Sequence, residues 1–191
     1  VNPIRRAALA RLDRAYWRVV VVGAVFTLAR FSEAFLVLRA QQVGIAASWV
    51  PLVMVAMNVV YAASAYPFGK LSDTVVHRRL LALGLLVLVV SDLVLAAADG
   101  WPVLLVGVAL WGVHMGMTQG LLAAMVADTA PAVLRGTAYG FFNLLSGVAM
   151  LVSSAIAGLL WDGFGSAFTF YAGAGFATLA LLVMLGFRWR A

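Results

Sequence analysis

The chain has 191 residues, of which 65% are hydrophobic and only 10% charged. Soluble domains are about half apolar and about a quarter charged, so this composition excludes a water-soluble protein and predicts an integral membrane protein. The net charge is +6 and there is no cysteine. The basic residues lie at the ends of apolar runs, which argues against a nucleic-acid partner, and the missing thiols exclude disulfides and thiolate metal sites.

Six apolar stretches are long enough to cross a hydrocarbon core of about 30 Å, which takes on the order of 20 helical residues. They lack the two-residue alternation of transmembrane β-strands, so we predict helices. We place the spans at roughly 17–38, 48–68, 80–98, 102–126, 137–160 and 167–187. A basic N-terminal segment, 1–16, precedes the bundle of residues 17–187, and a short tail, 188–191, follows it.

The distribution of Lys and Arg predicts the orientation of these spans. One side of the predicted bundle holds both chain ends and eleven of the thirteen basic residues, Arg30 lies within the first span, and the other side holds only Arg39. Positive residues favour the cytoplasmic side. We therefore expect a multi-pass protein of the cytoplasmic (inner) membrane with both termini in the cytoplasm.

The two halves of the chain resemble each other at a shift of about 89 residues. The shift places spans one to three on spans four to six, and it aligns residues 69–73 with 158–162, so that a G-x-L-x-D pattern closes spans two and five. Three is odd, so the second triplet crosses the membrane in the opposite sense. The predicted fold class is all-α, with six transmembrane helices in a 3+3 inverted repeat.

The polar run after the second span, G-K-L-S-D-T-V-V-H-R-R at residues 69–79, fits a tight cytoplasmic turn in which Gly69 permits a sharp reversal. It resembles the loop motif of the major facilitator superfamily of transporters, usually written G-x-L-[SA]-D-R-x-G-R-R. The residues that carry the resemblance are Gly69, Leu71, Ser72, Asp73, Arg78 and, one place on, Arg79. Thr74, Val76 and His77 depart from the motif. In that family the degraded copy of the loop is commonly in the second half of the molecule, so we expect the C-terminal half.

A second stretch, residues 127–140, resembles the connection between the fourth and fifth helices of a six-helix half in the same family, with its acid, proline and Arg-Gly pair. The resemblance implies half of a twelve-span secondary transporter that moves a small molecule by alternating access. Proton coupling and efflux of a lipophilic compound are the finer expectations. The implied partners are the substrate, protons, the lipid bilayer and a second six-helix half, in the same chain or in a homodimer; no cofactor is implied.

Two other classes stay open on the sequence alone. One is a non-transporting membrane sensor or intramembrane enzyme that uses Glu33, Asp92 and His114. The other is an inactive truncated half-transporter. No phosphate-binding loop or hydrolase motif supports an enzyme.

The first span contains the sharpest candidate site. Arg30 and Glu33 are three residues apart, hence on one helical face, with Thr27 a turn earlier. A charge at the centre of a span costs at least about 2.5 kcal/mol, so such residues are functional candidates. We expect this group to line a substrate and proton pathway in which Glu33 takes up and releases the proton. The alternative is a pair that neutralises itself between helices.

The fourth span supplies a second candidate face. Trp111, His114 and Thr118 lie three and four residues apart, with Gln119 beside them, which suits a pocket for an amphipathic substrate. The alternative is a histidine that bonds to a neighbouring helix. No second ligand stands at metal-binding spacing, so no metal site is predicted. The remaining pathway candidates are single amides at membrane depth, Asn58 and Asn143.

Four further expectations concern packing and charge. Gly112, Gly116 and Gly120 form small-x-x-x-small units that predict a close helix contact. Asp92 is expected to reach out toward the outer interface, and Ser146, Ser153 and Ser154 to be ordinary packing residues. Charge networks at the cytoplasmic helix ends are expected for Asp73 with Arg78 or Arg79 and for Asp128 with Arg135.

Overall fold

The computed structural model describes residues 9–186. The predicted tail, 188–191, and the first half of the predicted basic segment therefore lie outside the described residues. The described chain is helical, and its elements in order are α2 (Arg14–Leu28), α3 (Ala34–Gln42), α4 (Val50–Ser72), α5 (His77–Ala96), α6 (Trp101–Thr129), the short 3-10 helix η1 (Ala132–Leu134), α7 (Arg135–Phe164) and α8 (Ser166–Gly186).

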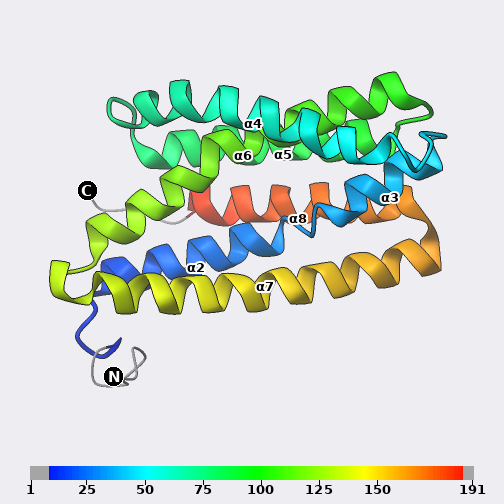
Figure 1. Ribbon diagram of the computed structural model, residues 1–191. Coiled ribbons are helices and arrows are strands. Elements are labelled where there is room, and N and C mark those ends of the chain that lie inside the picture. The colour runs from blue at the N-terminus through cyan, green and yellow to red at the C-terminus, as the bar shows by residue number, and fades with distance from the viewer. Residues whose placement is uncertain (1–8, 187–191) are drawn as a thin grey trace.

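Five of these helices, α4 to α8, are long and apolar enough to cross a membrane. Their positions match five of the predicted spans. The first predicted span, 17–38, is wrong as a continuous helix, because α2 ends at Leu28 and α3 begins only at Ala34. In Figure 1 the two short helices follow one another along the length of the bundle, with residues 29–33 unwound between them.

The helices lie roughly along one axis (Figure 1). In that view α4, α5 and α6 form the upper layer, α2 and α7 the lower one, and α8 runs between them. The start of α2 and the end of α8 lie at the same end of the bundle. At the opposite end, α7 passes into α8 through Gly165 alone, whose φ of 90° is a conformation that residues with a side chain rarely adopt.

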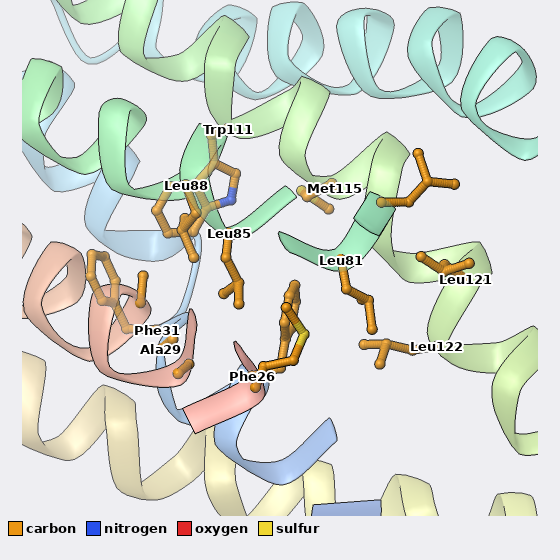
Figure 2. Close-up of a cluster of buried hydrophobic side chains, with 14 of the residues drawn as sticks. Phe26, Ala29, Phe31, Leu81, Leu85, Leu88, Trp111, Met115, Leu121 and Leu122 are labelled. Atoms are coloured by element: carbon orange, nitrogen blue, oxygen red, sulfur yellow. The ribbon is translucent and has the colours of Figure 1, made fainter. Parts of the chain in front are cut away.

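Of the five membrane-length helices, α6 and α5 are the most buried in the bundle. Figure 2 shows Trp111 and Met115 of α6 beside Leu85 and Leu88 of α5. By contrast, only 22% of the apolar window of α4 and 17% of that of α7 is buried. Much of these two helices is therefore left facing outward.

The glycines of α6 contact α4. A Cβ atom at Gly112 would lie 2.6 Å from the carbonyl oxygen of Met57, and one at Gly116 would overlap Ser64, so the two backbones approach closely here. Gly120 differs from the expectation, because an added Cβ would meet nothing within 4 Å. The close contact is therefore made by two of the three glycines.

The polar connection after α4 is built differently from the sequence expectation. The helix continues to Ser72, whose Oγ donates to the carbonyl of Gly69 at 2.6 Å, so Gly69 lies in the last helical turn and residues 73–76 make the reversal. Arg78 donates through Nη2 to the carbonyl of Leu185 at the end of α8, 2.6 Å away. Among residues 9–186 no Asp or Glu oxygen lies within 4.0 Å of a basic nitrogen, so the expected charge networks of Asp73 and Asp128 are absent there.

Arg39 ties three elements together at the other end of the bundle. Its guanidinium donates to the carbonyls of Leu95, Ala96 and Ala98 at the end of α5, at 3.1, 3.1 and 2.8 Å. It also donates to Ser166 Oγ at the start of α8, at 2.8 Å. A cation at a helix C-terminus satisfies carbonyls that have no partner within the helix, so one side chain of α3 fixes the ends of α5 and α8.

Candidate functional site

A cavity of about 540 Å³ lies between α2, α6 and α7. Five of the nine residues that the sequence assigned to a substrate and proton pathway contribute to its wall, and they come from three helices or their ends: Thr27, Arg30, Thr118, Gln119 and Asn143. Phe26, Leu122, Phe142 and Met150 supply apolar parts of the same wall. We call this space the central cavity.

Arg30 reaches the central cavity from the unwound segment 29–33. Backbone groups that leave a helix inside a membrane need partners from the protein. Two serines of α7 provide them: Ser153 Oγ donates to the carbonyl of Arg30 at 3.2 Å, and Ser154 Oγ accepts from the amide of Ser32 at 3.1 Å. The sequence interpretation of these serines as ordinary packing residues is therefore wrong.

Glu33 is not part of the cavity wall. It is the last residue of the unwound segment, directly before α3, and its carboxylate makes no ion pair with Arg30 within 4.0 Å among the described residues. The expectation that the two side chains share a helical face is wrong, because the helix that would align them is interrupted. Its role as a proton carrier stays a prediction.

Trp111 and His114 of α6 do not line the central cavity. Both are fully buried. His114 Nδ1 is 2.8 Å from the carbonyl oxygen of Gly84 on α5, and its ring stacks on Phe26 at 5.3 Å between centroids. This geometry is the alternative that the sequence left open, a histidine bonded to a neighbouring helix. Thr118 shares this face of α6, because its methyl group also lies against Gly84 and its hydroxyl donates to the carbonyl of His114 at 2.8 Å. Of the three residues only Thr118 reaches the central cavity.

The two amides differ from each other. Asn143 lies in the cavity wall, whereas Asn58 is exposed on α4 and donates to the carbonyl of Met54 in its own helix at 2.8 Å. Two tyrosines that the sequence did not single out border the same region. Tyr61 Oη donates to Gln119 Oε1 at 3.3 Å, and Tyr139, which lines the cavity, donates to the carbonyl of Ala123 at 2.8 Å. Their only sequence signal is a hydroxyl within an otherwise apolar span.

The chemistry of the central cavity follows from its wall. Arg30 is the only charged residue among the described lining residues, and hydroxyls and amides surround it. A guanidinium offers five donors and no acceptor, so it binds a carboxylate, phosphate or other strong acceptor. Within the described part of the chain no three His, Asp or Glu residues gather as a metal site would require. The cavity is therefore suited to binding a molecule with an apolar body and an acceptor group.

Comparison with known proteins agrees with this architecture. The sequence profile of the Major Facilitator Superfamily matches residues 19–191. An uncharacterized MFS-type transporter of Methanocaldococcus jannaschii is 30% identical over 186 residues, which are 94% of this chain and 46% of the relative. An uncharacterized protein of Mycobacterium tuberculosis is 30% identical over 62% of this chain and 28% of its own length. A D-xylose-proton symporter-like protein of Arabidopsis thaliana is 32% identical over 47% of this chain and 19% of its own length. The matched part of the chain thus spans less than half of each relative.

Proposed function

Because the chain belongs to the Major Facilitator Superfamily, a family of membrane transporters and not of enzymes, we propose that it forms one six-helix half of a secondary active transporter. In this proposal α2 and α3 together make the first crossing and α4 to α8 the other five. The degraded loop motif at residues 69–79 favours the C-terminal half. The termini face the cytoplasm, as the positions of Lys and Arg indicate.

The contacts between helices support the inverted repeat in this proposal. α4 packs on α6, and α7 packs on α2. An inverted repeat relates these two pairs, because it places the first crossing on α6 and α4 on α7. It also places α5 on α8, and these two helices pack on each other. The shift of about 89 residues also carries the start of α5, His77, onto the start of α8, Ser166. The outward faces of α4 and α7 then lie where a second six-helix half would complete the wall of the central cavity.

The observation that carries the transport proposal is Arg30 in an unwound part of the first crossing. Interrupted helices at membrane depth form the substrate sites of many secondary transporters, because the freed backbone and nearby side chains line a wet space. Here the interruption opens onto the central cavity, and Arg30 is the charge that faces it. The substrate class that fits is a small amphipathic molecule with a carboxylate or similar acceptor, moved by alternating access and coupled to protons.

The test uses the protein at its natural full length, reconstituted into liposomes. A panel of aromatic carboxylates, aromatic cations and D-xylose is offered with and without a pH gradient across the membrane. We expect gradient-dependent accumulation of at least one aromatic carboxylate. Binding of panel members without flux would favour the sensor alternative. Gradient-driven flux confined to aromatic cations or D-xylose would contradict the assignment of Arg30 as the group that selects the substrate.

A further inference from the structure

Asp92 occupies an unexpected place in the third span. From the sequence we expect this carboxylate to reach the membrane interface. That expectation is wrong, because the side chain has no exposed surface. It packs on α8 at Gly173, where an added Cβ would lie 2.6 Å from Asp92 Oδ2 and 2.7 Å from Phe31 Cε1. The carboxyl and the Phe31 ring thus fill the space that a side chain at Gly173 would need.

Neither oxygen of Asp92 has a hydrogen-bond partner among the described residues. The ionisable groups on the surrounding elements are His114 and Asp128 on α6, Tyr171 on α8, and Arg14, Tyr16, Arg18, Arg30, Glu33 and Arg39 on the first crossing. None of the basic groups lies within 4.0 Å of an Asp92 oxygen. Burying an ionised carboxylate without a partner is so costly that the group neutralises instead. The geometry is therefore that of a carboxylic acid which holds its proton.

Two more buried polar atoms without partners lie on the adjoining face of α6, namely Trp111 Nε1 and His114 Nε2. Side chains in a helix lean toward its N-terminus. Ser91 bonds to the carbonyl of Gly107, and His114 faces Gly84, so α5 and α6 run in opposite directions. The side chains of Asp92 and Trp111 therefore lean toward the same level of the bundle. Phe31 packs on Trp111 at 5.4 Å between ring centroids, and it covers this level from the first crossing.

Two consecutive residues of the unwound segment line two different cavities. Arg30 lines the central cavity, whereas Phe31 lies over Asp92 and lines a separate cavity of about 230 Å³ between α7 and α8. This second cavity, which also touches Gly173, gives the Phe31 ring room to move away from the carboxyl. A displacement of residues 29–33 would then join Asp92 to the central cavity.

We propose that Asp92 is a proton-binding site, closed off by Phe31 and opened to the central cavity when the unwound segment 29–33 moves. The proton comes from water in the central cavity and returns to it. Only the link to transport rests on the proposed function; proton binding at Asp92 stands on the burial and contacts of the carboxyl. The site is distinct from Glu33, which the sequence favoured as the carrier.

The direct test is infrared spectroscopy of the full-length protein in lipid nanodiscs at neutral pH. We expect an absorption band of a protonated carboxylic acid that disappears in Asp92→Asn. Asp99→Asn is the matched control, because Asp99 is exposed in the connection from α5 to α6. A spectrum without such a band, or a band unchanged in Asp92→Asn, would overturn the proposal. Should Asp92→Asn not accumulate in membranes, Asp92→Glu takes its place, and an unshifted band would then assign the proton to another group.

The closure of the site by Phe31 is tested by transferring the protein into heavy water, which shifts the infrared band as the acid exchanges its proton. Phe31→Ala should speed this exchange, whereas Phe176→Ala, which changes the wall of the same cavity at another residue, should leave it unchanged. Equal exchange rates in Phe31→Ala and in the unchanged protein would contradict the role of Phe31 in closing the site. The two proposals can fail separately. An infrared band without substrate flux would support the proton site and contradict the transport proposal. Substrate flux without the band would support transport and contradict the proton site.

Discussion

The polar groups around α6 lie in two different environments, the central cavity and the core packed against α5. On the side of α7, hydroxyls and amides line the central cavity, and the unwound backbone of the first crossing is paired with Ser153 and Ser154. On the side of α5, Asp92, Trp111 and His114 are sealed from solvent, and each keeps an atom without a partner. The comparison teaches that polar groups lie in two environments within one bundle: paired groups surround a cavity, and groups with unpartnered atoms are buried in the core.

The largest effect is expected at the cavity side, from Arg30→Ala. A hydrogen bond to a charged group is worth about 1.5–3 kcal/mol, so loss of the guanidinium should weaken binding of an anionic substrate by roughly tenfold to 150-fold. Substrate titration of the full-length protein measures this change. Arg18→Ala, which removes an exposed arginine outside the cavity, is the matched control. Equal affinities of the Arg30→Ala variant and the unchanged protein would place the substrate elsewhere.

The next effect belongs to the sealed side. Gly173→Ala brings a methyl group into the space of the Asp92 carboxyl and the Phe31 ring, and such overpacking costs about 1–3 kcal/mol of folding free energy. Combining it with Asp92→Ala should recover part of the loss, because the second change vacates the space. Thermal unfolding in detergent compares the two single variants and the double variant. Strictly additive losses would mean that residues 92 and 173 do not touch.

A smaller effect tests the support of the unwound segment. Ser153→Ala and Ser154→Ala each leave one backbone group of residues 30–32 without its partner, at a cost of about 1 kcal/mol each. We expect reduced stability together with weaker substrate binding, because the segment that carries Arg30 loosens. Ser146→Ala removes a serine of the same helix that lines the cavity but bonds to neither backbone group. A Ser146→Ala variant that behaved like the other two would show that the paired backbone is not the cause.

The smallest effect is expected from His114→Phe. The ring already stacks on Phe26, and the Gly84 carbonyl that loses its contact lies within α5, so we expect a change of less than about 1 kcal/mol in stability and unchanged substrate affinity. Substrate titration again measures the affinity. A large loss of affinity would break the distinction between the central cavity and the buried core, because it would connect a buried residue to the cavity.

The sequence predicts part of this structure well, for a physical reason. The length of an apolar run is a local property, so the positions of α4 to α8 follow from it. The break in the first crossing does not, because its backbone is held by serines that lie 122 and 123 residues further along the chain. Asp92 was misplaced for a similar reason: its burial depends on Gly173 of α8 leaving space for it. In the same way, the glycine spacing in α6 predicts a close contact but not that α4 makes it.

Arg39 has a mechanical consequence for the whole bundle. Because one guanidinium holds the ends of α5 and α8 to α3, these three helices are clamped at that end and should shift as a single lever. The interruption at residues 29–33 then separates the clamped half of the first crossing from α2. A rocking motion in this molecule would pivot at residues 29–33, while Arg39 keeps α3, α5 and α8 together.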